Sequence, residues 1–289
     1  MSRSVRLTIL VIAVAAFPLP ACRRPAPPPP GTGVELVPVA ALPADPEDGV
    51  WNMADEFIAD LLPQDLVEPR KLHPTTTAVR VRAVTDGKDV AFRLEWSDPS
   101  DDDTSDPARF SDACAVQLPA KIEPTVPAPQ MGEKGRPVEM TFWTAAWQAT
   151  VDGRGDSIRD LYPNAAVDHY PFQAPALEKD PAGQREMAVR YAPALALGNR
   201  MAGPRDQPVQ DLIAEGPGTV HPAPASDSRG CGHRTPNGWA VVITRRLPAG
   251  LSPEVGSQIA LAVWNGTHQE VGARKMRTGW INLTMRGNP

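Results

Sequence analysis

Alternation of apolar and polar residues with a period of two is the feature that most constrains the fold of this chain. Val79 and Val81 alternate with arginines, and a second run of the same kind extends from Val90 to Trp96. Such alternation is typical of strands that bury one face. Asp86-Gly87, which lies between the two runs, is a common hairpin turn. These segments therefore predict an antiparallel β-hairpin.

More strand-like segments follow, most of them bounded by proline, glycine or asparagine. They are Ala113–Leu118, Val138–Ala145, Met187–Tyr191, Trp239–Leu247, Gln258–Trp264 and Trp280–Met285. The 34 prolines and 22 glycines, spread along 289 residues, favour short strands and loops over long helices. We therefore predict an all-β fold, a β-sandwich of two antiparallel sheets with long loops and few short helices. Long polar loops are expected at Asp98–Asp106 and Pro204–Thr235, and such loops commonly carry ligands.

The N-terminus has the pattern of an export signal. Arg3 and Arg6 precede an apolar run that ends at Phe17 and is too short to span a bilayer as a helix. The letters LPAC that end at Cys22 resemble a bacterial lipobox, which implies cleavage before Cys22 and acylation of its thiol. The alternative is an ordinary cleaved signal in which Cys22 is incidental.

Three sections are expected along the chain. Residues 1–21 are predicted to be the signal peptide, 22–47 a lipid-anchored proline-rich tether, and 48–289 one folded domain. The tether contains the run PAPPPP, and consecutive prolines favour an extended polyproline II conformation. The prediction is a periplasmic protein that is attached to a membrane through lipid.

Composition and missing motifs argue against several function classes. The chain has 29 basic and 34 acidic residues and a net charge of −5, and loss of Arg3 and Arg6 would make it about −7, so nucleic acid is disfavoured as a partner. The sequence has no HExxH, GxSxG, P-loop, Rossmann glycine pattern or CxxCH. Hydrolase, nucleotide-binding and c-type haem functions therefore lack their usual support.

Two groups of residues leave alternatives open. Cys114 and Cys231 can form a disulfide in an oxidising compartment or remain separate thiols. The aspartates Asp98, Asp101, Asp102 and Asp103 offer oxygen ligands for calcium but lack the EF-hand spacing. A solvated loop is therefore preferred for them.

Two segments together resemble one family. The first is VPAPQMGE at 126–133, a proline-stiffened loop with an isolated methionine, Met131. The second is IALAVWNG at 259–266, followed by EVGARK at 270–275. The pair resembles the haem b γ-subunits of periplasmic molybdenum enzymes, a group that includes ethylbenzene dehydrogenase, dimethylsulfide dehydrogenase, and chlorate and selenate reductases. The resemblance extends from about Trp51 to Thr284.

The resemblance implies that the chain binds one b-type haem with Met131 and Lys275 as the axial ligands. A thioether favours ferrous iron, and lysine can bind a metal only as the free amine. Two axial ligands leave no open position on the iron, so the resemblance implies an electron relay and not a catalyst. Without the resemblance, Met131 would be interpreted as a loop residue and Lys275 as an exposed lysine. Met201 is a reserve sulfur ligand, whereas Met140 fits a strand core.

Arg274 and Arg277 lie on either side of Lys275. An arginine near a haem ligand can pair with a propionate, and Arg274 is assigned as the cofactor-binding residue on this hypothesis. The alternative for either arginine is a role in solubility. Tryptophans can pack on the porphyrin or in the core, and the candidates are Trp143, Trp147 and Trp264.

The resemblance also implies partners for the chain. They are a molybdopterin catalytic subunit, an iron–sulfur subunit and a c-type cytochrome, between which the haem would relay electrons. Two other functions fit a β-sandwich, namely a carbohydrate-type ligand-binding module and a structural lipoprotein without haem. The first predicts exposed aromatic platforms and no Soret band.

Overall fold

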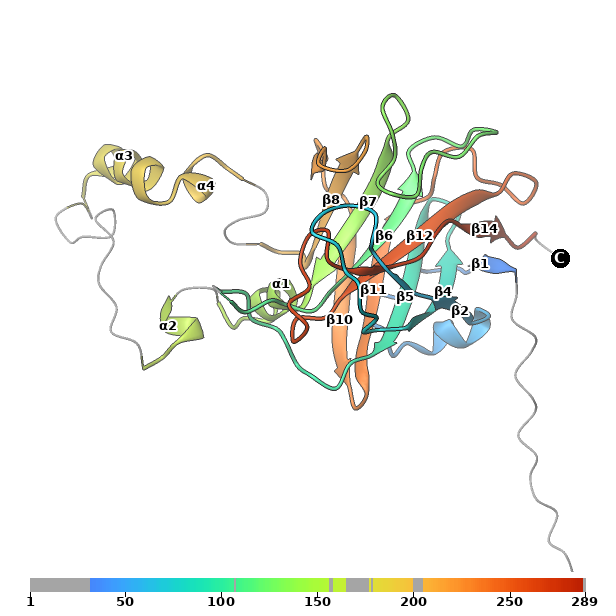
Figure 1. Ribbon diagram of the computed structural model, residues 1–289, viewed down its shortest axis with the longest axis horizontal. Coiled ribbons are helices and arrows are strands. Elements are labelled where there is room, and N and C mark those ends of the chain that lie inside the picture. Colours follow the sequence, from blue (N-terminus) through green and yellow to red (C-terminus); the bar gives the residue numbers. More distant parts are fainter. Residues whose placement is uncertain are drawn as a thin grey trace, which may run out of the picture. The chain divides into compact units, whose positions relative to one another are not determined.

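The structure, a computed structural model, describes residues 32–106, 108–155, 158–164, 177, 179–199 and 205–287. Strands dominate this part of the chain (Figure 1). The strands are β1 (Gly33–Pro38), β2 (Phe57–Asp60), β3 (Leu62–Pro63), β4 (Ala78–Thr85), β5 (Asp89–Ser97), β6 (Ala113–Pro119), β7 (Val138–Thr144), β8 (Val209–Ala214), β9 (His221–Pro222), β10 (Arg229–Thr235), β11 (Gly238–Arg246), β12 (Ser257–Trp264), β13 (Met276–Arg277) and β14 (Ile281–Met285). The helices are a 3-10 turn at Gly49–Met53, α1 (Ala145–Val151), α2 (Ile158–Leu161), α3 (Pro181–Tyr191) and α4 (Pro193–Ala196).

Two sheets share strand β12. One sheet has the order β10-β11-β5-β4-β1-β14-β12, and the other has the order β12-β6-β7-β8-β9. The first part of β12, Ser257–Ile259, pairs with β14, while Ala260–Trp264 pairs with β6. The main hydrophobic core contains buried side chains from both sheets, such as Phe92 and Trp143. The predicted all-β sandwich is therefore confirmed.

Strand β1 differs from the prediction in direction and in place. It runs parallel to both of its neighbours, β14 and β4, so this sheet is mixed and not wholly antiparallel. It also lies inside the segment 22–47 that was predicted to be a tether. Val34 and Leu36 are 1% and 0% exposed because β1 is a central strand of its sheet. The folded part of the described chain thus includes residues from Gly33 onward, earlier than position 48.

Two local predictions were wrong. Met187–Tyr191 was expected to be a strand but lies in α3, where Asp180 caps the helix by accepting hydrogen bonds from two backbone amides and Pro181 occupies the first turn. The segment Pro204–Thr235 was expected to be a loop, yet it contains β8, β9 and β10. β10, RGCGHRT, is rich in polar residues and glycine, and β9 has only two residues, so the periodicity of this segment is weak.

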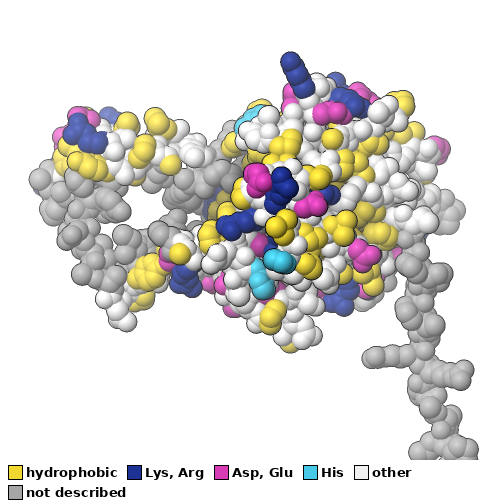
Figure 2. Space-filling model, in the orientation of Figure 1, with side chains coloured by type: hydrophobic (Ala, Val, Ile, Leu, Met, Phe, Trp, Pro, Cys, Tyr) yellow, Lys and Arg dark blue, Asp and Glu magenta, His cyan; other side chains and the backbone are white. Residues whose placement is uncertain are grey.

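The remaining sequence features are placed as follows. Cys114 is buried in the core and Cys231 is half-buried, and neither is in a disulfide. In the described part of the chain, no helix is long and apolar enough to cross a bilayer. Basic and acidic side chains are interspersed on the face drawn in Figure 2. Cys22 and Met201, together with the predicted signal peptide, lie outside the described residues.

Candidate functional site

A cavity of about 630 Å³ lies on the outer face of the second sheet. We call it the Met–Lys cavity, because both Met131 and Lys275 line it. The two residues come from loops about 140 positions apart in sequence, and the fold brings them to one site. The other lining residues include Gln64, Val67, Glu68, Pro69, Ala115, Gln117, Met140, Phe142, Leu212, Val220, Ala260, Ala262, Trp264, Ala273 and Arg277. A volume of this size suits a ligand as large as an organic cofactor.

The floor of the cavity is formed by side chains of β12, β6 and β7, with alanines on β12 and β6. Along β6, Cys114 and Val116 point into the core, so Ala115 points outward between them. The strand register sets Ala262, Ala115 and Phe142 side by side in one row, and Ala260, Gln117 and Met140 in the next. Because alanine side chains are short, they project little from the sheet in both rows, and a flat group can lie against the sheet there.

Met131 lies in the loop between β6 and β7 with a left-handed backbone conformation, φ 69°. This conformation is uncommon for a residue other than glycine and costs on the order of 1 kcal/mol, so neighbouring contacts must maintain it. The amide of Gly216 donates a hydrogen bond to the Met131 carbonyl oxygen over 2.8 Å. Next to it, Gly132 has φ 75°, and a Cβ there would lie 2.9 Å from a backbone oxygen. The backbone of Met131 is thus fixed from both sides.

Two side chains anchor the loop before Met131. The amide of Gln117, on the cavity floor, donates to the Pro129 carbonyl oxygen over 3.0 Å. The indole N–H of Trp280 donates to the Pro127 carbonyl oxygen over 2.6 Å. Prolines cannot donate backbone hydrogen bonds, so these contacts use the only backbone groups that the prolines offer. Two hydrogen bonds therefore fix the part of the loop that precedes Met131.

Lys275 directly precedes β13, and Gln64 fixes the backbone around it. The backbone amide of Gln64 donates to the Lys275 carbonyl oxygen over 3.0 Å, and its side-chain amide donates to the Ala273 carbonyl oxygen over 3.0 Å. The Gln64 side chain also binds the backbone of Val67, and the residue is 4% exposed. Gln64 therefore ties one wall of the cavity to the segment that carries Lys275.

The amine of Lys275 is poorly solvated. Burial lowers the pKa of Lys275 to about 8, and the positive charge of Arg277 adds to this effect. Its Nζ lies 4.9 Å from the centre of the Trp264 ring. A thioether and an easily deprotonated amine are both neutral donors, which suit a metal of borderline or soft character.

The loop between β12 and β13 is held by a buried ion pair. Glu270, whose side chain is 1% exposed, lies 2.8 Å from the Nζ of Lys71. Its carboxylate also accepts a hydrogen bond from the Thr75 hydroxyl over 2.5 Å and from the backbone amide of Asn265 over 3.0 Å. Because Lys71 and Gln64 belong to one segment, that segment contacts the Lys275 loop at two points.

Buried carboxylates hold the start of the same loop. Asp112 accepts hydrogen bonds from the Gly266 amide and from the indole N–H of Trp239, both over 2.9 Å. Asp98 accepts one from the side-chain amide of Asn265 over 2.9 Å. Within the described residues, no three histidine, cysteine or acidic side chains are grouped to hold a metal ion. Here Asp98 anchors a loop from a buried position, in contrast to the solvated position expected from the sequence.

The pKa of Asp112 predicts a pH-dependent contribution to stability. Burial, with Asp98 nearby, raises its pKa from 3.8 to about 7. The folded state then holds a proton that the unfolded state releases, so this contribution falls as pH rises from about 4 to about 7. Urea unfolding of wild type and Asp112→Asn should show the variant gaining about 2 kcal/mol relative to wild type between pH 5 and pH 8. An equal stability difference at both pH values would contradict this assignment.

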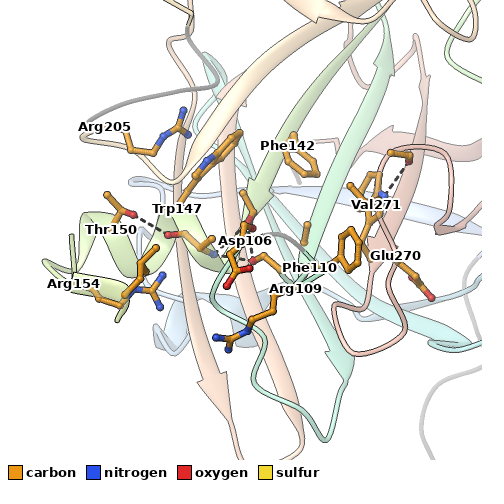
Figure 3. A pocket seen from close by; sticks show the side chains of 18 residues that line it. Asp106, Arg109, Phe110, Phe142, Trp147, Thr150, Arg154, Arg205, Glu270 and Val271 are labelled. Carbon is orange, nitrogen blue, oxygen red and sulfur yellow. Dashed lines mark hydrogen bonds between the residues drawn. The ribbon is translucent and has the colours of Figure 1, made fainter. Parts of the chain in front are cut away.

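A second cavity of about 620 Å³ borders the first, and both are lined by Phe142 and Trp264. Figure 3 shows Trp147 and Phe142 on its wall, with Arg205 over the Trp147 ring at 3.6 Å. Of the three candidate tryptophans, Trp264 lines both cavities and Trp147 lines only the second. Trp143 is 0% exposed and packs in the core.

The sequence prediction named Met131 and Lys275, which line one cavity, but it named few of the residues around them. The floor alanines carry a usable signal, because Ala260 and Ala262 recur with period two on one face of their strand. Gln64 and Lys71 lie in a loop and have no periodicity that could have identified them. Of the two flanking arginines, Arg277 lines the cavity and Arg274 is not among the residues that do.

Comparisons with known proteins place the chain in a family. A Haloferax mediterranei protein provisionally named respiratory nitrate reductase heme subunit ORF7 is 21% identical over 293 residues, covering 99% of this chain and 83% of that protein. Two solved structures of a family 9 carbohydrate-binding module from Caldicellulosiruptor kristjanssonii also match, each at 9% identity. The complex with cellotriose has a TM-score of 0.43 and covers 89% of this chain and 94% of that chain. The complex with glucose has a TM-score of 0.39 and covers 88% and 97%. Similarity at this level does not say what this chain binds.

The family model described as ethylbenzene dehydrogenase matches residues 48–276, more than half of the sequence. This match contains β2 to β12, the Met131 loop and Lys275. The chain therefore belongs to the ethylbenzene dehydrogenase family.

Proposed function

We propose that this chain is an electron-transfer subunit that binds one b-type haem in the Met–Lys cavity and is not itself a catalyst. The observation that carries the proposal is that Met131 and Lys275, from separate loops, line one large and mostly apolar cavity. The name of the Haloferax relative describes a haem subunit of a respiratory reductase, which supports the same class of function.

The residues of the cavity fit a haem. The alanine floor suits a flat macrocycle, and most of the surrounding lining surface is apolar. Arg277 has a buried Nε without a hydrogen-bond partner, which suits a ligand with an acidic edge. A thioether and a free amine are both competent axial ligands for haem iron.

Each of the two proposed ligands has a separate part in the function. A bound haem b supplies a one-electron couple. Met131, held on its anchored loop, presents a neutral sulfur, and axial methionine raises the reduction potential of haem iron. Lys275 loses its proton readily because of burial, which makes its nitrogen available to a metal. If Met131 and Lys275 both held the iron, no position on it would remain for a substrate.

The proposal extends to the assembly around the chain. An electron relay needs a donor and an acceptor, so we place it between the iron–sulfur subunit of a molybdopterin enzyme and a c-type cytochrome. We further propose that the chain is exported to the periplasm, acylated at Cys22 and attached there to a membrane. Labelling with a radioactive or alkyne fatty acid should mark wild type and not Cys22→Ala, whereas equal labelling would exclude this anchor.

Redox titration of the haem-loaded full chain tests the relay. The expected result is one reversible one-electron step per chain and stoichiometric electron transfer from the reduced protein to a ferric c-type cytochrome. The same reduced protein should not be oxidised by nitrate or chlorate alone, since the iron has no open position. Sustained turnover of either oxyanion by the isolated chain would overturn the non-catalytic assignment.

Filling the cavity floor should block binding without unfolding the protein. Ala115→Leu adds bulk at the centre of the floor, and a well-packed site tolerates added methylenes poorly. We expect haem affinity to fall at least about tenfold, while the urea midpoint changes little because the side chain points outward from the core. Ala113→Leu, on the same face of β6 but lining only the second cavity, is the matched control. Equal losses in both variants would contradict the placement of the ligand on Ala115.

A further inference from the structure

Arg277 and Lys275 point to the same side of the chain. They are two positions apart and flank Met276, which is 0% exposed and packs in the core. Alternate residues of an extended segment face opposite ways, so the flanking side chains both face outward. Both line the Met–Lys cavity. Arg277 is also close enough to Lys275 for its charge to affect the lysine electrostatically.

The guanidinium of Arg277 has one buried donor without a partner, as does that of Arg274, but only Arg277 lines the cavity. Its Nε is buried and makes no hydrogen bond. Its Nη1 makes one long contact, 3.4 Å, to the Thr278 carbonyl oxygen. A buried donor without a partner costs about 1–3 kcal/mol, so such groups in folded proteins usually have a partner. A bound ligand would provide one here.

Within the described residues, the acidic side chain that lines the cavity is exposed and already paired. Glu68 is the acidic residue among its described lining residues, and its carboxylate lies 2.8 Å from Nε of Arg70 with 74% of the side chain exposed. The lining also includes the guanidinium of Arg277, which stays positively charged when Lys275 is a neutral amine. An incoming carboxylate would pair with the unpartnered Nε and a second N–H of Arg277 in the bidentate geometry that guanidinium favours.

We propose that Arg277 is the residue that binds a carboxylate of the cavity's ligand, and that it fixes the orientation of the ligand by this contact. The inference rests on the proposed function, in which the ligand is haem b and the carboxylates are its propionates. It differs from the sequence prediction, which assigned this role to Arg274. The backbone amide of Arg274 bonds to the Val271 carbonyl oxygen in a turn, and its side chain does not line the cavity.

Haem binding with and without free carboxylates tests the inference. The purified full chain, freed of haem, is titrated with iron protoporphyrin IX and with its dimethyl ester, and the Soret band is followed. Wild type should bind the free acid about ten- to hundredfold more tightly than the ester, as expected for a charge-assisted bidentate contact. In Arg277→Gln this preference should largely disappear while affinity for the ester stays the same. Arg274→Gln and the distant surface control Arg246→Gln should keep the wild-type preference.

The outcomes separate two kinds of failure. If wild type binds neither compound, the proposed function fails and this inference with it. If wild type binds haem but Arg277→Gln keeps the full preference for the free acid, only the inference fails. Loss of the preference in Arg274→Gln alone would restore the sequence-based assignment. A drop of equal size for acid and ester in Arg277→Gln would indicate a role in shape and would also overturn carboxylate binding.

Discussion

Replacing Lys275 or Met131 by alanine is expected to convert the bound haem from six-coordinate low-spin to a high-spin form, or to abolish binding. Each change deletes one of the proposed bonds to iron, and even groups one shell further out change metal affinity by about 10–100-fold. We therefore expect at least a hundredfold loss of affinity in each variant. The measurement is the absorption spectrum of the loaded protein together with a titration of the haem-free form.

The same variants should fold as well as wild type. Among the described residues, the Lys275 amine has no ion pair or hydrogen bond, and it is desolvated. Removing it therefore costs the haem-free protein little stability, and the urea midpoint should stay or rise. Lys134→Ala and Met140→Ala are the controls, the first on the exposed part of the Met131 loop and the second on the cavity floor. Both should remain low-spin, and a low-spin spectrum in Lys275→Ala would remove that residue from the site.

Lys71→Ala is expected to destabilise the protein by about 3 kcal/mol or more, because it leaves the Glu270 carboxylate buried without its cation. Two hydrogen-bond donors, from Thr75 and Asn265, would remain. Chemical unfolding in urea at pH 7 measures the change. Since Glu270 holds the loop that leads to Lys275, haem affinity should fall in the same variant.

A neighbouring ion pair provides the matched control. Arg70 contacts Glu68 over 2.8 Å, but the two side chains are 54% and 74% exposed. Arg70→Ala should therefore cost less than about 1 kcal/mol. Adding Glu270→Gln to Lys71→Ala removes the uncompensated charge and should recover part of the loss. If the double variant is as unstable as Lys71→Ala, buried charge is not the cause.

The sandwich could be predicted from sequence because its central strands carry a clear signal. The hairpin of β4 and β5 shows the alternation, and the Asp86-Gly87 turn has Gly87 at φ 86°. The sequence pattern predicted the wrong structure where contacts with other parts of the fold determine the conformation. β1 is a short run among prolines that becomes a strand only because β14 and β4 lie on either side of it. The apolar letters of 187–191 fit a strand or a helix, and the Asp180 cap favoured the helix.

Few residues of the site were named from the sequence: the two proposed ligands, and Met140, Trp264 and Arg277 among the alternatives. Met131 and Lys275 came from the family resemblance, and nothing in their own surroundings in sequence predicts that they share a cavity. Arg277 lies two positions from Lys275, with the buried Met276 between them. Both side chains face the cavity only because this segment is extended, and the sequence alone does not establish that conformation. The Lys71–Glu270 ion pair joins residues about 200 positions apart. A single sequence contains no local pattern that identifies a pair at that separation.

The most direct test of the central claim is the absorption spectrum of the wild-type chain, oxidised and then reduced with dithionite, with a pyridine haemochrome assay of the same sample. We predict one b-type haem per chain and a low-spin spectrum in both oxidation states, because the proposed ligands Met131 and Lys275 would both bind the iron. A protein that is colourless, and stays colourless after incubation with haem, would contradict the account and leave a ligand-binding or structural module in its place.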